Sequence, residues 1–161
     1  MQTVLAVVPV VSVVLTGLFA GLFFAFSVAV MPGLRRVGDR VMIETMQGIN
    51  VAILNPLFAL VFLGAPVAAL VTVVLYATGG AWAAAGWAAV AAAALVAVLV
   101  VTFAANIPRN NALEEAGPAE NVADPAAVRG AFETVWGRWN HVRSWLSAVA
   151  LVCGVVAVGV G

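Results

Sequence analysis

The stretch TMQGINVAILNPLFALVFLGAPVAALVTVVLYATGGAWAAAGWAAVAAAALVAVLVVTFAANIP, from Thr45 to Pro108, contains 64 residues and no charged side chain. A transmembrane helix needs only about 20 apolar residues, so a run of this length predicts two crossings of a membrane. The sequence Thr78-Gly79-Gly80 predicts the turn between them, because glycine accepts the backbone conformations of tight turns. We therefore expect helices over about 51–77 and 82–105.

Two more apolar runs flank this stretch, over residues 4–31 and 144–161. Each is long enough to cross a bilayer as a helix, although the second only just spans it at about 1.5 Å per residue. The predicted fold class is therefore all-α: a four-helix transmembrane bundle with a polar helical and loop region on one membrane face. We expect residues 1–161 to form a single integral membrane domain whose main partner is the lipid bilayer.

The composition excludes several classes of protein. Hydrophobic residues make up 65% of the 161 residues and charged residues only 9%, against about 25% charged in soluble domains. A chain this short cannot hide such an excess in a core, so a soluble monomer is excluded, and so is a disordered chain. The net charge is zero, which leaves no basic field to attract nucleic acid. All basic residues are Arg, a usage typical of GC-rich bacterial genomes.

Prolines mark the expected ends and kinks of the helices. We expect Pro32 to end the first helix and Pro108 to end the third, because proline lacks the backbone N–H that continues a helix. Pro56 and Pro66 are expected to kink the second helix. Pro125 suits the first position of a fourth helix, with the Asp before it as N-cap.

The positions of the Arg residues predict the orientation in the membrane. All seven lie in segments 32–50 and 106–143, and none lies in the termini or in the 78–81 turn. Under the positive-inside rule, both segments are cytoplasmic and both termini lie outside the cell membrane. Within the first segment, the polar residues 34–50 are expected to be helical.

A stripe of small residues, Gly17, Gly21, Ala25 and Ala29, recurs every fourth position of the first helix. Such stripes let another transmembrane helix approach closely. We favour packing within the chain, with a homo-oligomer formed through this stripe as the alternative.

The chain has one Cys, Cys153, and one His, His141. An intrachain disulfide is therefore excluded, and zinc, copper and haem sites usually need two or more His or Cys ligands. We expect no bound metal and no cofactor.

The last helix carries one polar stripe at helical spacing, formed by Arg129, Glu133, Trp136, Asn140, Arg143 and Ser147. Arg143 stands at the start of the apolar run, where an ionised group is costly unless it is paired or hydrated. One interpretation is that it reaches the interface while Trp136 and Trp139 form an aromatic belt. The other is a polar pocket that also uses Asn140. His141 borders the stripe, and as the only group that titrates near neutrality it is either a solvated residue or a base.

Amide side chains gather at the same predicted membrane level. Gln47, Asn50 and Asn55 precede or begin the second helix, and Asn106, Asn110 and Asn111 follow the third. An unsatisfied amide near hydrocarbon is expensive, so these groups seek partners. Capping of helix ends is the simpler interpretation for each one alone, and their convergence favours a pocket.

Five short motifs follow one another along the chain: Val30-Met-Pro-Gly-Leu, Met46-Gln-Gly-Ile-Asn, Asn55-Pro, Asn106-Ile-Pro-Arg-Asn and Trp136-Gly-Arg-Trp-Asn-His-Val-Arg. In this order they resemble the anthrone-oxygenase-like family of small four-helix membrane proteins. The resemblance covers nearly the whole chain. The family's Asn-x-Pro-x-Asn falls on Asn106, Pro108 and Asn110, with Arg109 where an apolar residue is expected.

This resemblance implies oxidation of a hydrophobic aromatic anthrone by O₂ as co-substrate, without metal or flavin. The implied chemistry needs a base, donors for an oxyanion and an apolar slot for flat rings. It assigns His141 as base, with Asn140, Arg143 and Asn110 at the oxyanion and Trp136 and Trp139 stacked on the ring; Gln47, Asn50, Asn55 and Asn106 complete the expected substrate site.

Two other function classes remain open at this point. The first alternative is a non-catalytic membrane module that packs with a partner or binds a small hydrophobic molecule in the same pocket. The second, a transporter, is weaker, because the sequence has no evident inverted repeat and no charge pair within the membrane.

Overall fold

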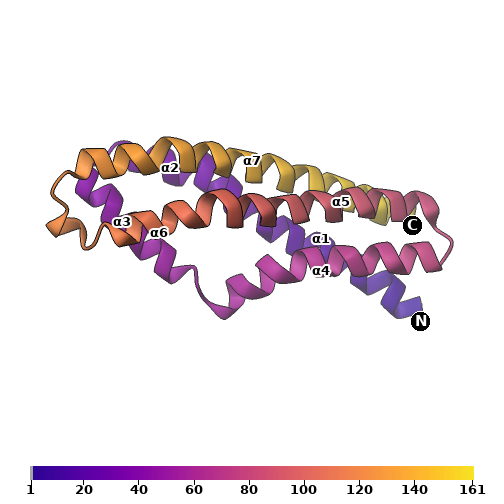
Figure 1. The fold of residues 1–161 in the computed structure, drawn as a ribbon. Helices are drawn as coiled ribbons and strands as arrows, with labels where there is room; N and C mark the ends of the chain where they lie inside the picture. The colour runs from indigo at the N-terminus through magenta and orange to yellow at the C-terminus, as the bar shows by residue number, and fades with distance from the viewer. Residues whose placement is uncertain (1) are drawn as a thin grey trace.

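The computed structural model describes residues 2–161, and every long element in it is a helix. Four helical rods run antiparallel to one another (Figure 1). In chain order the elements are α1 (Gln2–Ala25), η1 (Phe26–Val30), α2 (Met31–Leu34), α3 (Asp39–Ala52), α4 (Pro56–Thr78), α5 (Trp82–Val101), η2 (Thr102–Asn106), α6 (Ile107–Glu115), η3 (Ala119–Asn121) and α7 (Pro125–Val160). Four stretches of helix are long and apolar enough to cross a membrane, which confirms the predicted all-α multi-pass bundle.

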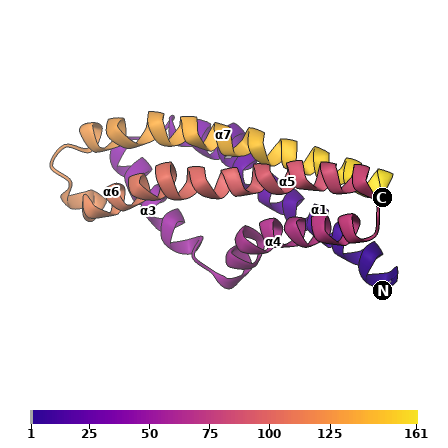
Figure 2. The ribbon, with the colours of Figure 1, turned by 45° about the vertical axis from the view of Figure 1, so that its right-hand side comes forward.

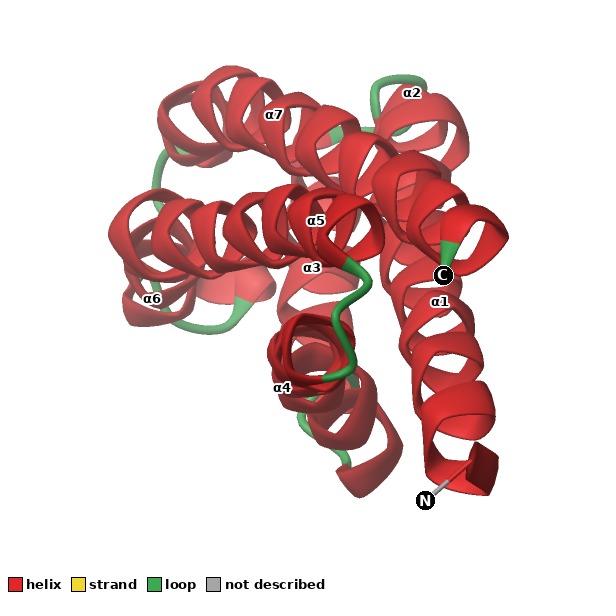
Figure 3. Cartoon of the chain, turned by 90° about the vertical axis from the view of Figure 1, so that its right-hand side faces the viewer, coloured by secondary structure: helices red, strands yellow, loops and turns green. Residues whose placement is uncertain are grey.

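The rods pack through small residues on one side and aromatic residues on the other. The most extensive contact joins α5 to α7, and these two helices run side by side in Figures 1 and 2. The buried face of α5 is built largely from alanine, including Ala84, Ala88 and Ala91, so the neighbouring helices approach closely. The centre of the bundle holds Phe19, whose ring stacks on Phe62 at 5.7 Å between centroids. Figure 3 looks along the bundle and shows α1 and α4 on the other side of this core.

Two prolines that were expected to end helices do not end them. A single π-helical turn, η1, precedes Pro32, and a second, η2, precedes Pro108. The π turn shifts the backbone hydrogen bonds by one residue, which accommodates a residue that has no N–H and whose ring crowds the preceding turn. The first rod therefore runs on to Leu34 and the third to Glu115, and the expected helix ends at 31 and 105 are wrong.

The second rod begins later than expected because the chain breaks before it. The polar helix α3 extends to Ala52, three residues form a bend, and α4 starts at Pro56 instead of near residue 51. Asn55 caps α4 by accepting a hydrogen bond from the Phe58 N–H at 2.9 Å, so Pro56 occupies a first helical position and makes no kink. The bend stands away from the other rods in Figures 1 and 2.

Two other predicted features, the cap of the last helix and the glycine turn, are confirmed. Asp124 caps α7, accepting a hydrogen bond from the Ala127 N–H at 3.0 Å. The turn between α4 and α5 contains Gly80 at φ 79°, a left-handed conformation that favours glycine.

Both termini lie at one end of the bundle and the polar connections at the other (Figure 1). An ion-pair network fastens the polar end: Arg129 bonds Glu133 at 2.6 Å and Asp39 at 3.0 Å, and Arg35 bonds Glu133 at 3.0 Å. Arg40 reaches across to backbone carbonyls of the loop that contains η3, Ala119 and Val122 among them. The charged segments are thus folded against one another, where solvent screening makes each exposed pair worth about 1 kcal/mol or less.

The small-residue stripe of the first rod packs within the chain at one position. A side chain at Gly17 would lie 3.8 Å from Leu151 of α7. Gly21, Ala25 and Ala29 are exposed on the single chain, and oligomer formation through them stays a prediction.

Candidate functional site

A pocket of about 880 Å³ opens where the bend between α3 and α4 leaves the bundle. Its walls come from all four rods, and most of its lining is apolar. Seven of the larger apolar side chains that line it are Leu22, Phe23, Phe26, Phe58, Phe62, Phe103 and Trp136. A cavity of this size and character takes a small hydrophobic molecule, and the many aromatic faces suit a flat one.

The guanidinium of Arg143 lies in the wall of this pocket although the side chain is only 5% exposed. Its Nη2 donates to Asn140 Oδ1 at 2.8 Å, and its Nη1 approaches Thr102 Oγ1 at 3.5 Å. The ring of Phe23 lies 4.3 Å from its central carbon, and the ring of Trp136 lies 5.2 Å away. The cation is thus held by one amide, one hydroxyl and two aromatic faces.

No carboxylate neutralises this cation within residues 2–161. The ion pairs of the described chain join Arg35 and Arg129 to acidic partners and do not include Arg143. Its Nε is buried and has no hydrogen-bond partner among these residues. An unpaired buried charge costs several kcal/mol, and here it lies beside a cavity.

Asn140 holds Arg143 in place and is itself fixed by the first π turn. It is 1% exposed, and its Nδ2 donates to the carbonyl of Phe23 at 3.0 Å and to Ser27 Oγ at 2.8 Å. Ser27 belongs to η1, and Thr102 on the other side of Arg143 belongs to η2. Both π turns therefore contribute a hydroxyl to the same polar cluster, and π turns are frequent at functional sites.

Trp136 forms a wall of the pocket one turn before Asn140 on α7. Its Nε1 donates to Asn110 Oδ1 at 2.7 Å, which ties the ring to α6. Phe132 stacks on it from the side at 5.8 Å between centroids, and Phe26 packs against it at 5.6 Å. The indole is thereby held with little freedom beside the guanidinium.

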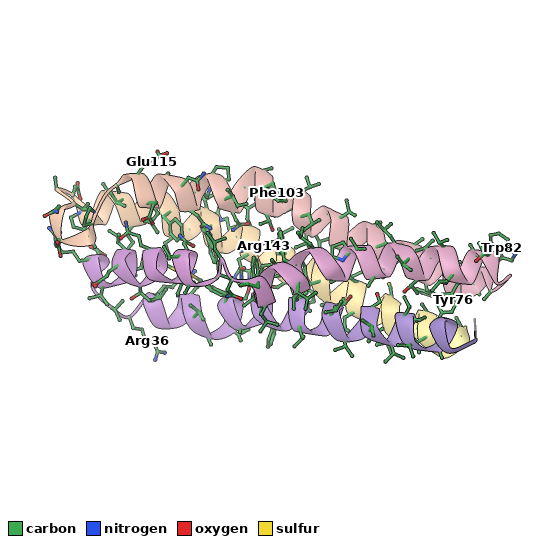
Figure 4. All side chains as sticks on the ribbon, turned by 90° about the horizontal axis from the view of Figure 1, so that it is seen from below. Arg36, Tyr76, Trp82, Phe103, Glu115 and Arg143 are labelled. Atoms are coloured by element: carbon green, nitrogen blue, oxygen red, sulfur yellow. The ribbon has the colours of Figure 1, made fainter. Side chains whose placement is uncertain are left out.

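The site lies at the end of α5 that is remote from Trp82. Helix α5, with 20 residues, spans about 30 Å from Trp82 to the level of Thr102, which is about one hydrocarbon thickness. Trp82 and Trp145 are 73% and 74% exposed and mark the two levels expected for aromatic belts. Figure 4 shows Arg143 near the middle of the molecule, between Trp82 at one end and Glu115 toward the other.

The amide residues singled out in the sequence divide into two groups. Asn50, Asn55, Asn110 and Asn111 line the pocket, and the buried Nδ2 of Asn50 has no partner among the described residues. Gln47 instead joins α3 to α6, donating to the carbonyls of Leu113 and Gly117 at 2.9 Å each.

Asn106 supports the site from behind its wall. It is 1% exposed, does not line the pocket, and donates to the Trp136 carbonyl at 3.3 Å. Gln47 and Asn106 thus fix the walls and do not face a ligand.

Two expected site residues lie outside the pocket. His141 is exposed on α7, because one residue along a helix turns the side chain by about 100° away from Asn140. Trp139 is 38% exposed and likewise does not line the pocket. Neither side chain is placed to act on a molecule held there, so the base and one stacking partner expected from the resemblance are not found at these positions.

Several site residues could not be found from the sequence pattern. Thr102 and Phe103 lie inside an apolar run, and Phe23 and Ser27 lie in the first one, where nothing distinguishes them from lipid-facing residues. Glu114, which also lines the pocket, was not singled out by the sequence pattern. The sequence feature that marks both π turns is a proline, Pro32 or Pro108, two residues after the turn.

Comparison with known protein families finds a match to this chain. A family model described as anthrone oxygenase matches residues 58–153, which include most of α4, all of α5 and α6, and the part of α7 that carries Trp136, Asn140 and Arg143. No curated protein and no solved structure matches the chain.

Proposed function

The chain belongs to the anthrone oxygenase family, and we propose that it oxidises a flat aromatic ketone of the anthrone type with O₂ in the Arg143 pocket. The observation that carries the proposal is the buried guanidinium of Arg143, which has no acidic partner in the described chain and faces an aromatic-lined cavity. Such a site suits a molecule with apolar rings and one oxygen that becomes negative.

The proposed reaction begins with ionisation of the ketone. The methylene group opposite the carbonyl loses a proton to give an aromatic enolate, with the negative charge largely on oxygen. The enolate gives an electron to O₂, and the two radicals join through a new C–O bond at the former methylene carbon. The resulting peroxide anion takes up a proton to give a hydroperoxide, which loses its remaining C–H hydrogen and its terminal O–H group as water to give the quinone. One O₂ is consumed, one oxygen atom enters the product and the other leaves as water.

Arg143 supplies the electrostatic part of this chemistry. A guanidinium N–H aimed at the enolate oxygen stabilises charge that is small in the ketone and large in the enolate, which is how an oxyanion site accelerates a reaction. Asn140 and Thr102 orient the guanidinium, while Trp136 and Phe23 flank it. The proton passes to water at the polar end of the pocket. We propose O₂ as the co-substrate, with no cofactor.

The mouth of the pocket favours a substrate that arrives from the bilayer. Leu54, Leu63 and Phe103 line the pocket and are themselves exposed, at 79%, 54% and 57%. An apolar molecule dissolved in lipid can therefore enter between α4 and η2, past these apolar side chains. By the distribution of Arg residues, we place this level at the cytoplasmic side of the cell membrane.

The test is turnover by purified protein in detergent or nanodiscs. Anthrone is added, and O₂ uptake and quinone absorbance are followed together. We expect both rates to exceed the protein-free oxidation rate, with one O₂ consumed per quinone formed. Rates equal to the protein-free control across a range of protein concentrations would overturn the proposal for this substrate.

One observation favours a second candidate, a non-catalytic module that binds a hydrophobic anion. His141, which the resemblance assigns as the base, lies outside the pocket. A binding module predicts saturable binding of anthrone-type ligands with no increase in O₂ uptake, so the same experiment separates the two functions.

A further inference from the structure

A closed ring of hydrogen bonds lies next to Arg143 and passes through Asn140. We propose that two serines of this ring, Ser27 and Ser144, are positioning residues that set the direction of the Arg143 guanidinium. Neither serine lines the pocket, so each acts through another side chain. The inference rests on the proposed function and adds two residues on which its rate depends.

The hydrogen bonds of the ring run in one direction. Asn140 Nδ2 donates to Ser27 Oγ at 2.8 Å. Ser144 Oγ donates to the Asn140 backbone carbonyl at 3.0 Å, and a hydroxyl group has a single hydrogen to give. In the contact of 2.9 Å between the two hydroxyls, Ser27 is therefore the donor and Ser144 the acceptor. The ring thus leads from the Asn140 side chain through both hydroxyls and back to the Asn140 main chain.

The ring joins two rods of the bundle. Ser27 belongs to η1, the π turn of the first rod, which packs against α7. Ser144 follows Asn140 by four residues on α7, so both side chains lie on one face of that helix. The π turn is therefore the element that brings the first rod's hydroxyl to the Asn140 amide.

These contacts fix which way the Asn140 amide faces. Both of its N–H groups are used, by Ser27 Oγ and by the carbonyl of Phe23 at 3.0 Å. Oδ1 is left to accept from Arg143 Nη2 at 2.8 Å. A flipped amide would set Oδ1 against the Phe23 carbonyl and its N–H groups against the guanidinium, so both ends would lose their partners. Asn140 is 1% exposed and does not line the pocket, so it acts on a ligand through Arg143.

The guanidinium depends on this amide for its direction. Within residues 2–161 it donates to Asn140 Oδ1 and to Thr102 Oγ1, and the second contact, at 3.5 Å, is at the long limit of a hydrogen bond. An arginine side chain has many rotamers, so its one short hydrogen bond decides where the remaining N–H groups point. An amide that is free to rotate would therefore spread those N–H groups over several directions.

Hydroxyl groups between transmembrane helices also hold helices together, at about 1 kcal/mol each. A role confined to stability predicts a lower unfolding temperature and an unchanged rate for the folded enzyme. A positioning role predicts a lower kcat with little change in KM, because the guanidinium acts on charge that appears in the transition state. The experiment therefore measures kcat, KM and thermal unfolding on the same preparations.

The full-length protein is compared with Ser27→Ala, Ser144→Ala and the double variant, with anthrone-dependent O₂ uptake as the rate. Ser147→Ala is the matched control. Ser147 is a buried serine of the same helix, and its hydroxyl donates to the Arg143 backbone carbonyl at 2.7 Å without joining the ring.

We expect each single variant to lower kcat about 2-fold to 10-fold, as loss of one neutral hydrogen bond does, while KM changes less than about twofold. The double variant should fall no further than the slower single variant, because both substitutions open the same ring. Ser147→Ala should keep the kcat of the unaltered protein.

Three results would overturn the inference while the unaltered protein still turns over anthrone, so that the proposed function stands. They are an unchanged kcat in both single variants, losses that multiply in the double variant, and an equal loss in Ser147→Ala. A fall in unfolding temperature with activity lost in proportion would likewise show a role confined to stability. If the unaltered protein does not turn over anthrone, the proposed function fails and this inference fails with it.

Discussion

Replacing Arg143 by methionine should lower activity and leave stability unchanged or higher. Arg143 is buried without an acidic partner in the described chain, so the folded state bears a desolvation cost of several kcal/mol that methionine does not incur. Against this gain, Asn140 Oδ1 loses its donor, at about 1–3 kcal/mol. The free energy of unfolding should therefore stay the same or rise in Arg143→Met. Removal of a residue that holds the fold together would instead lower it.

Arg143→Met should lower the catalytic rate even though it does not lower stability. A hydrogen bond from a charged donor is worth about 1.5–3 kcal/mol, which at about 1.36 kcal/mol per factor of ten lowers kcat/KM about 10-fold to 150-fold. The assay is anthrone-dependent O₂ uptake, run beside thermal unfolding of the same preparation. Arg138→Met is the matched control, because Arg138 is exposed on the same helix and does not line the pocket.

The reasoning is refuted by either of two results. Activity within twofold of the unaltered protein would show that the guanidinium does not stabilise charge in the reaction. A clear fall in the unfolding temperature, with activity lost in proportion, would show that Arg143 serves the fold and not the ligand.

Three further predictions follow from the placement of individual residues. His141→Ala should keep at least half of the O₂ uptake, since His141 is exposed and outside the pocket; a loss above tenfold would restore it as the base. Asn140→Leu should lower both activity and unfolding temperature, because Asn140 bonds the Phe23 carbonyl as well as Arg143; an unfolding temperature at or above that of the unaltered protein would contradict this. A periplasm-active reporter should work when fused after Gly161 and be silent when inserted at Gly117, and the reverse pattern would invert the predicted orientation.

The number and positions of the membrane helices could be predicted because scarcity of charge is a signal that averages over many residues. The uncharged run from Thr45 to Pro108 is too long for a single transmembrane helix, so two helices were predicted. The cap formed by Asp124 could be predicted because Asp is a common N-cap residue and Pro125 follows it. The helix ends at Pro32 and Pro108 could not be predicted, because a proline either ends a helix or is accommodated by a π turn. Backbone hydrogen bonding decides between the two, and residue type alone does not reveal it.

Some residues of the candidate site could be predicted from the sequence, and others could not. Helical spacing on the last rod brought Trp136, Asn140 and Arg143 together, and the structure buries all three. His141 and Trp139 were expected from a motif whose residues are adjacent in sequence, although neighbours on a helix point in different directions. The apolar contributors, such as Phe103, could not be separated from lipid-facing residues, because both kinds of surface select the same side chains.

The central claim is that Arg143 stabilises the enolate of a bound aromatic ketone, and the most direct test is an anaerobic pH titration of that ketone. Without O₂ no turnover occurs, and the enolate is followed by its absorbance with protein in excess. We expect the pKa of bound anthrone to fall by about 1–2 units relative to anthrone in protein-free detergent, the equivalent of one charge-assisted hydrogen bond. The shift should disappear in Arg143→Met and persist in Arg138→Met. A pKa that is unchanged or raised on binding would contradict the account, because the pocket would then favour the neutral ketone.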